Sequence, residues 1–151
     1  MARVYLKGLP QLKAKLIRLK ERTAEAVKPA MAQAAQEIVD MMKRQVPVDK
    51  GDLRDSIGWT FGDKPKYAQA ITKQSAGGFT ITIFAGNTKV RYAHLVEFGT
   101  APHPQGGQFE GTEHPGTKAQ PFFWPTWRAK KRDVQKILRA AIKKAVRDAV
   151  R

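Results

Sequence analysis

Apolar residues recur at three- and four-residue spacing through the first third of the chain, with lysine and arginine between them. This spacing places the apolar side chains on one face of a helix, and it predicts a helix over residues 8–45. Pro29 lies inside that pattern, where a proline removes one backbone hydrogen bond and clashes with the preceding turn. We therefore expect either a kink at Pro29 or two consecutive helices with Pro29 in the first turn of the second, and we expect Pro47 to end the segment.

The periodicity changes from helical to extended after Ile57. The residues IGWTF are typical of the start of a strand, and residues 67–85 indicate a hairpin in which YAQAIT and GFTITIFA are strands joined by the turn QSAGG. Phe79, Ile81 and Ile83 alternate with their neighbours at the period of two expected for a strand with one buried face. A small antiparallel sheet is therefore predicted after the first helix.

Residues 99–121 are rich in glycine and proline, which occupy nine of the 23 positions. A loop of this length without structure of its own is uncommon inside a compact domain, and it is usually functional or ordered only by a partner. The residues PFFWPTW follow it and lead into a second amphipathic helix. We expect Pro125 at the first helical position of that helix and an apolar stripe between Val134 and Val146.

These elements predict a single α+β domain over residues 1–151. In order they are a long N-terminal helix, a small antiparallel β-sheet, a short segment, the long Gly/Pro loop 99–121 and a C-terminal amphipathic helix. Two amphipathic helices can bury their apolar stripes by covering such a sheet. A chain of 151 residues is long enough for one domain with a sizeable core.

Positive charge is concentrated at the two ends of the chain, whose net charge is +15. Residues 1–45 hold ten basic and four acidic side chains, residues 127–151 hold ten and two, and the middle holds eight and seven. This asymmetry favours a polyanionic partner or an acidic protein surface, although two solvated helix faces would also explain it. The candidate polyanion contacts are Arg128, Lys130, Lys131, Arg132, Lys136, Arg139, Lys143 and Lys144.

The residue types that catalysis and metal binding require are sparse. The chain has no cysteine, which excludes thiolate metal sites and thiol nucleophiles, and no apolar run of about eighteen residues that could cross a membrane. His94 and Glu97 would share a helix face, but His103 and His114 lie in the Gly/Pro loop, which positions metal ligands poorly. We therefore predict no catalytic residue, no metal, no cofactor and no membrane contact. Non-specific DNA binding stays open as an alternative function, because the basic C-terminal helix could neutralise phosphates.

Two short segments are expected to form sharp turns that support the fold. In VPVDKGDLRDSI, Asp49 is predicted to cap a turn, Gly51 to adopt a positive φ, and Leu53 and Ile57 to anchor one helical turn.

In RYAHLVEFGT, we expect one short turn to pack onto the sheet and Gly99 to end it in the left-handed conformation, just before Thr100. Glu97 is predicted either to pair with Arg54 or to cap a backbone amide as the chain enters the loop. The side chains expected to pack are Tyr92, Leu95, Val96 and Phe98.

Aromatic residues are grouped at the junction between the Gly/Pro loop and the C-terminal helix. Such a group belongs either to a protein core or to an interface. The loop and this junction are our candidate for a subunit contact, because a loop of this length needs a function. The candidate interface residues are His103, Phe109, His114, Phe122, Phe123, Trp124 and Trp127.

Three motifs together resemble those of one protein family. VPVDKGDLRDSI resembles its P-x-D-T-G-x-L-R-x-S-I segment, with Lys50 where threonine is usual, and RYAHLVEFGT resembles its Y-A-x-x-V-E-F-G-T segment. AQPFFWPTW is similar to its A-x-P-F-L-x-P-A segment, with Trp124 and Thr126 departing from the usual residues. The motif order and the flanking charged helices also agree. The family is the gene-product-ten-like group of small tail-completion, or head–tail joining, proteins of long-tailed bacteriophages.

The resemblance implies a structural virion protein without enzymatic activity, made in the host cytoplasm and placed at the neck between head and tail. It also implies a ring homo-oligomer, a hexamer that matches the symmetry of the tail, with neighbouring neck and tail proteins and packaged DNA as contacts. Tail-terminator and head-closure roles in the same neck stay open. Because ring-closing contacts join two different patches, we expect the 99–121 loop to supply one patch and the N-terminal helix or sheet the other.

Overall fold

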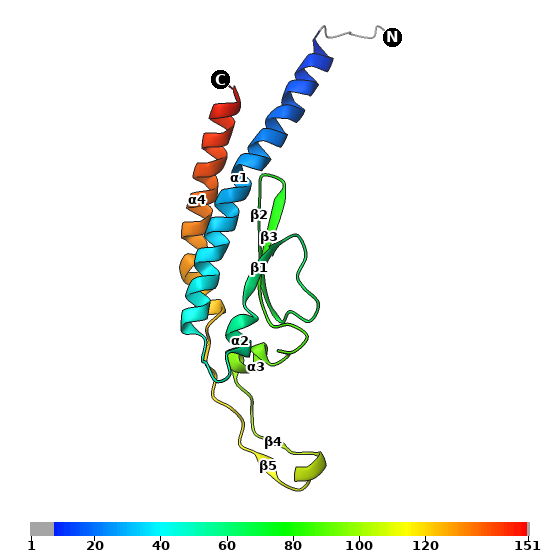
Figure 1. The fold of residues 1–151 in the computed structure, drawn as a ribbon, viewed down its shortest axis with the longest axis vertical. Helices are drawn as coiled ribbons and strands as arrows, with labels where there is room; N and C mark the ends of the chain where they lie inside the picture. Colours follow the sequence, from blue (N-terminus) through cyan, green and yellow to red (C-terminus); the bar gives the residue numbers. More distant parts are fainter. Residues whose placement is uncertain (1–7, 151) are drawn as a thin grey trace, which may run out of the picture.

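The computed structural model describes residues 8–150 and shows an α+β domain in three layers. The long helix α1 (Leu9–Gln45) lies between α4 (Trp124–Val150) on one side and a three-stranded antiparallel sheet on the other (Figure 1). The sheet has the order β1-β3-β2. Its strands are β1 (Gly58–Phe61), β2 (Ala70–Ala76) and β3 (Phe79–Ala85). The predicted fold class is therefore confirmed.

Helix α1 is continuous through Pro29, so the alternative of two consecutive helices is wrong. The exposed Pro29 lies on the helix surface, where its ring avoids the core. The helix ends at Gln45 because Val46 is extended, with a ψ of 136°, immediately before Pro47. A residue that precedes proline is sterically biased toward this extended conformation.

The buried stripe of α1 runs from Thr23 to Met42 and does not include residues 9–22. Leu12 and Leu16 are 53% and 55% exposed, because this end of the helix extends beyond the sheet (Figure 1). The apolar periodicity therefore predicted the helix correctly, but only its second half packs into the core, which contains Val27, Met31, Ala34, Ala35, Ile38, Val39 and Met42.

Strand β3 is central in the sheet, and Ile81, Thr82 and Ile83 are all buried. The turn between β2 and β3 is shorter than predicted, because residues 74–76 continue β2 and only two glycines, 77 and 78, connect the strands. Trp59 in β1 fastens the sheet to α1 by donating a hydrogen bond of 2.8 Å from its indole N–H to Gln36.

Five short elements lie at one end of the molecule. Helices α2 (Asp52–Asp55) and α3 (Ala93–Phe98) sit below the sheet, and the chain then projects from the body (Figure 1). The projection is a hairpin with strands β4 (His103–Pro104) and β5 (Glu113–His114) and a 3-10 turn η1 (Gly107–Phe109). The Gly/Pro segment thus has regular structure of its own, which its composition did not indicate.

Within residues 8–150, none of the helices combines the length and the apolar character that crossing a membrane requires.

Candidate functional site

The projecting hairpin, here called the arm (residues 100–117), is closed at its base by paired threonines. Thr100 and Thr117 exchange two backbone hydrogen bonds, of 2.9 and 3.1 Å, and their hydroxyl oxygens lie 3.0 Å apart. Two glycines permit this close crossing. A Cβ on Gly99 would lie 2.5 Å from the carbonyl oxygen of Thr117, and a Cβ on Gly116 would overlap the carbonyl oxygen of Thr100. Both glycines have a positive φ, of 73° and 80°.

Glu97 joins the two ends of the arm to the body. Its carboxylate is buried, and it accepts backbone N–H hydrogen bonds from Phe122 at 2.8 Å, Phe123 at 2.9 Å and Trp124 at 3.0 Å. These amides open α4, where unpaired N–H groups and the helix dipole favour a negative charge. Of the two roles predicted for Glu97, capping is therefore correct, although the capped amides follow the arm rather than precede it.

Pairing of Glu97 with Arg54 is wrong, because the Arg54 guanidinium contacts Asp55 at 3.2 Å. Gly99 ends α3 as predicted, but its ψ of −179° is extended and not left-handed helical.

The junction after the arm belongs to the core. Phe122 and Phe123 have no exposed surface, and Trp127 is 7% exposed, so their predicted place in a subunit interface is corrected. They are buried because α4 begins where the chain returns under α1, and the Thr126 hydroxyl fixes this return by lying 2.6 Å from the Gln45 side-chain oxygen. Trp124 is half-buried, with its ring 5.3 Å from that of Phe123.

The three other candidate interface residues lie in the arm. Phe109 is 63% exposed at its tip, and His103 and His114 stack with their ring centroids 5.0 Å apart. None of the arm residues is buried. These side chains are therefore available to a partner, which keeps their predicted interface role open.

An apolar groove of about 380 Å³ lies between α3 and the base of the arm. The prediction that α3 packs its apolar side chains onto the sheet is wrong for three of them, since Tyr92, Leu95 and Phe98 are 41%, 40% and 68% exposed. Of the four, Val96 alone packs against the core, beside the buried Ala93 of the same helix. The groove is lined by Tyr92, Leu95, Val96, Thr100, His103, His114, Thr117, Lys118 and Gln120.

The segment around α2 supports this end of the body. Leu53 and Ile57 are buried and Gly51 has a φ of 89°, as predicted. No side chain caps α2, so the predicted Asp49 cap is wrong and Gly51 takes the N-cap position. On the neighbouring loop Lys89 contacts Asp52 at 2.9 Å, and this hydrogen bond, together with the carboxylate charge, raises the pKa of Lys89.

The histidine and carboxylate that suggested catalysis point in different directions. The exposed His94 lies 2.8 Å from the Gln69 side-chain oxygen, whereas Glu97 is buried against backbone amides. Across residues 8–150, no group of three or more histidine, aspartate or glutamate side chains is arranged to hold a metal ion.

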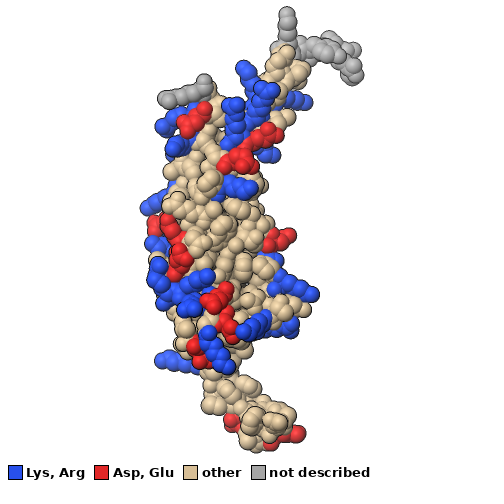
Figure 2. Space-filling model, viewed as in Figure 1, with Lys and Arg blue, Asp and Glu red and all other residues tan. Residues whose placement is uncertain are grey.

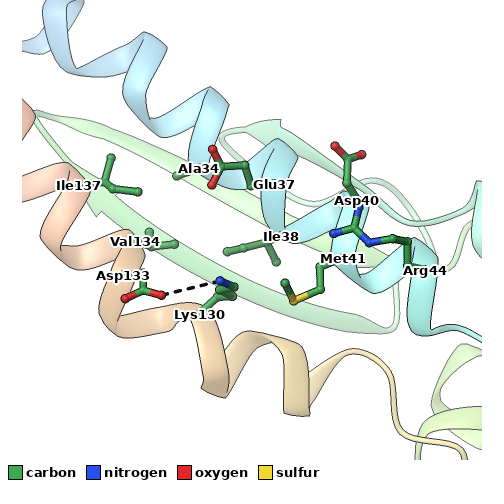
Figure 3. A pocket seen from close by; sticks show the side chains of 10 residues that line it. All are labelled: Ala34, Glu37, Ile38, Asp40, Met41, Arg44, Lys130, Asp133, Val134 and Ile137. Carbon is green, nitrogen blue, oxygen red and sulfur yellow. Dashed lines mark ion pairs between the residues drawn. The ribbon is translucent and has the colours of Figure 1, made fainter.

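A cleft of about 360 Å³ lies between α1 and α4 (Figure 3). Ile38 and Val134 point toward each other across it, and the charged side chains around them include the pair Lys130 and Asp133, 3.8 Å apart. The lining holds no histidine, serine, threonine or cysteine. We therefore interpret the cleft as the seam between two packed helices.

The candidate polyanion contacts lie on α4, away from the core. All of them are exposed except Lys130, which is half-buried beside Asp133. Five of them, at spacings of four, four, three and four residues, form a stripe along the helix, since residues three and four apart share a face. This stripe is Arg128, Arg132, Lys136, Arg139 and Lys143.

Sequence reasoning missed two features of the site. Gly116 was treated only as one of the many glycines of the loop, although it allows two backbone segments to cross closely. The residue that accepts hydrogen bonds from the first amides of α4 was not predicted either. A signal for the second existed, because Pro121, Phe122 and Phe123 offer no side-chain oxygen to cap a helix.

Comparison with known proteins agrees with the motif resemblance. The family model described as "Bacteriophage HK97-gp10, putative tail-component" matches residues 11–99, from α1 to the end of α3. No curated protein and no solved structure matches the chain significantly. The match covers more than half of the chain and stops at Gly99, where the arm begins. The chain therefore belongs to the HK97-gp10-like family of bacteriophage tail components, which are structural proteins and not enzymes.

Proposed function

We propose that this tail component is a ring-forming subunit of the phage neck, which completes the tail and joins it to the capsid connector. The observation that supports ring formation is the arm. This hairpin has no buried residue, projects from a compact body and exposes Phe109. A ring of identical subunits needs two different patches that meet head to tail and close. The arm is one patch, and the hexameric symmetry of the tail sets the expected copy number.

The first test is the oligomeric state of the purified protein. Light scattering after size-exclusion chromatography should give a mass near six copies, and negative-stain electron microscopy should show closed rings. A protein that stays monomeric at micromolar concentration and is absent from purified tails would contradict the proposal.

The second test places the ring in the particle. Phage that lack this protein should accumulate full heads beside unattached tails, because the joint between them is missing. Over-long tails would instead favour the tail-terminator role in the same neck, and heads that leak DNA would favour head closure. Normally joined particles would refute all three roles.

We further propose that the basic stripe of α4 contacts packaged DNA without reading its sequence. The observation that favours this contact is the alignment of five exposed Lys/Arg side chains along one face of the helix. Their spacing is suited to neutralising successive phosphates, and such binding weakens steeply as the salt concentration rises, because the release of condensed counterions becomes less favourable.

Unrelated DNA duplexes should bind equally well, with an affinity that falls between low and moderate salt. Replacing Arg132 and Arg139 with glutamine should reduce that salt dependence by about two counterions. A matched control makes the same glutamine replacement at Lys64 and Lys73, near the sheet. It should leave both the DNA affinity and its salt dependence unchanged. Unaltered salt dependence in the α4 variant would mean that the stripe is only a solvated helix face.

A further inference from the structure

The arm has too little structure of its own to be stable as an isolated element. All of its residues are exposed or half-buried, and its two strands contribute only two residues each. A two-stranded hairpin of this kind is marginally stable in water without a surface to pack on. The exposed Phe109 at its tip adds an apolar surface that contact with a partner would bury.

The arm also differs in charge from the rest of the chain. It contains Glu110 and Glu113 and no lysine or arginine, so the other residues together carry a net charge of +17. Figure 2 shows acidic side chains at the tip of the arm, and on the visible face of the body it shows basic side chains with fewer acidic ones between them. The arm is therefore electrostatically complementary to the body of another copy of the same chain.

The groove between α3 and the base of the arm fits the tip in size and in chemistry. Its volume of about 380 Å³ accommodates an aromatic ring, Leu95 and Tyr92 supply apolar walls, and the exposed Lys118 is part of its lining. The tip cannot fill its own groove, because Phe109 lies at the far end of the arm beyond β4 and β5 (Figure 1).

We propose that Phe109 of one copy inserts into the groove beside α3 of the next copy, with Glu110 close to Lys118. This inference rests on the proposed ring and identifies both of its patches. Tip and groove are two different patches of one chain, as a head-to-tail contact requires, and both lie on the same side of the sheet, toward the arm (Figure 1). A head-to-tail contact of this kind forms a ring when the rotation between neighbours closes, which is what the proposed ring requires. The partner patch is thus on α3 rather than on the N-terminal helix or sheet.

The absence of cysteine from the chain permits a direct cross-linking test. Full-length Phe109→Cys is mixed with full-length Leu95→Cys, and the mixture is oxidised after the rings have exchanged subunits. Because each chain has a single thiol, a bond between positions 109 and 95 can form only between copies. The matched control pairs Phe109→Cys with Leu12→Cys. Leu12 is similarly exposed but lies near the start of α1, at the end of the molecule away from the arm.

The expected result is a disulfide dimer that contains one chain of each kind in the first mixture and not in the control. Phe109→Ala should weaken association roughly tenfold or more, as loss of a buried aromatic anchor does, while Leu12→Ala should not.

Intact rings that give no 109–95 cross-link, or that cross-link equally in both mixtures, would overturn the docking contact and leave the ring standing. A wild-type chain that is monomeric throughout would instead overturn the ring itself.

Discussion

Replacing Glu97 with alanine should destabilise the protein more than any other single change to a charged side chain. The substitution removes three hydrogen bonds to the amides of Phe122, Phe123 and Trp124, and it leaves at least two of those donors buried without an acceptor. Each buried unsatisfied amide costs about 1–3 kcal/mol, and loss of a helix cap costs a similar amount. Relief of the desolvation of the carboxylate offsets part of this cost.

We therefore expect Glu97→Ala to lower the free energy of unfolding by about 3 kcal/mol. A chain of this length has a total stability of about 8–20 kcal/mol, so the variant should still fold. Its melting temperature should fall by roughly 6–12 °C. Glu97→Gln should give a smaller loss, because one oxygen acceptor remains but the negative charge at the start of α4 is gone.

The assay is urea denaturation followed by tryptophan fluorescence, since Trp124 and Trp127 adjoin the site. All variants are made in a Phe109→Ala background, so that subunit association does not add to the measured stability. His94→Ala, an exposed position on the same helix, is the matched control and should change the unfolding free energy by less than about 0.5 kcal/mol. The effect of Glu97→Ala should also be the same at low and high salt, because the contact is buried. A Glu97→Ala variant that unfolds within about 0.5 kcal/mol of its parent would refute the reasoning.

Three further changes test other parts of the structure. Phe122→Ala should cost about 3–5 kcal/mol in urea denaturation, because it empties a fully buried site, and a loss typical of a surface residue would restore Phe122 to the interface. Gly116→Ala should open the base of the arm, because its Cβ meets the Thr100 carbonyl, and limited proteolysis should then cut the arm while α1 stays protected. Pro29→Ala should raise the unfolding free energy by about 1–3 kcal/mol by restoring a helix hydrogen bond, and an unchanged or lower value in urea denaturation would contradict this.

The helices and strands with strong periodicity could be predicted from the sequence. The elements against which they pack could not. Period and breaker residues indicated α1, the start of β1, the β2–β3 hairpin and α4 with errors of a few residues. Periodicity reports which face of a helix is apolar, but not how far its neighbour extends. The leucines of the first turns belong to the same apolar pattern as Met31 but are exposed, because the sheet ends before it reaches them.

The site was less predictable because its key contacts join residues distant in sequence. Glu97 and Phe122 are separated by 25 positions, and no local pattern links a carboxylate to amides that far away. Phe122 and Phe123 were assigned to an interface because grouped aromatics occur both in cores and in interfaces. Only the tertiary arrangement distinguishes the two: the chain turns inward at Phe122, and it exposes Phe109 instead.

The buried carboxylate of Glu97 explains how one chain can combine a stable body with an arm that has no core. The hairpin is closed by the Thr100–Thr117 pair, and both of its ends are held by residues of the body, so its base is fixed while its tip gains stability from a partner. The body reaches its stability through α1, the sheet and α4, and the tip can change without a cost to folding. Substitutions at the tip should therefore alter assembly alone, those in the core should alter folding alone, and Glu97 is the position where one change affects both.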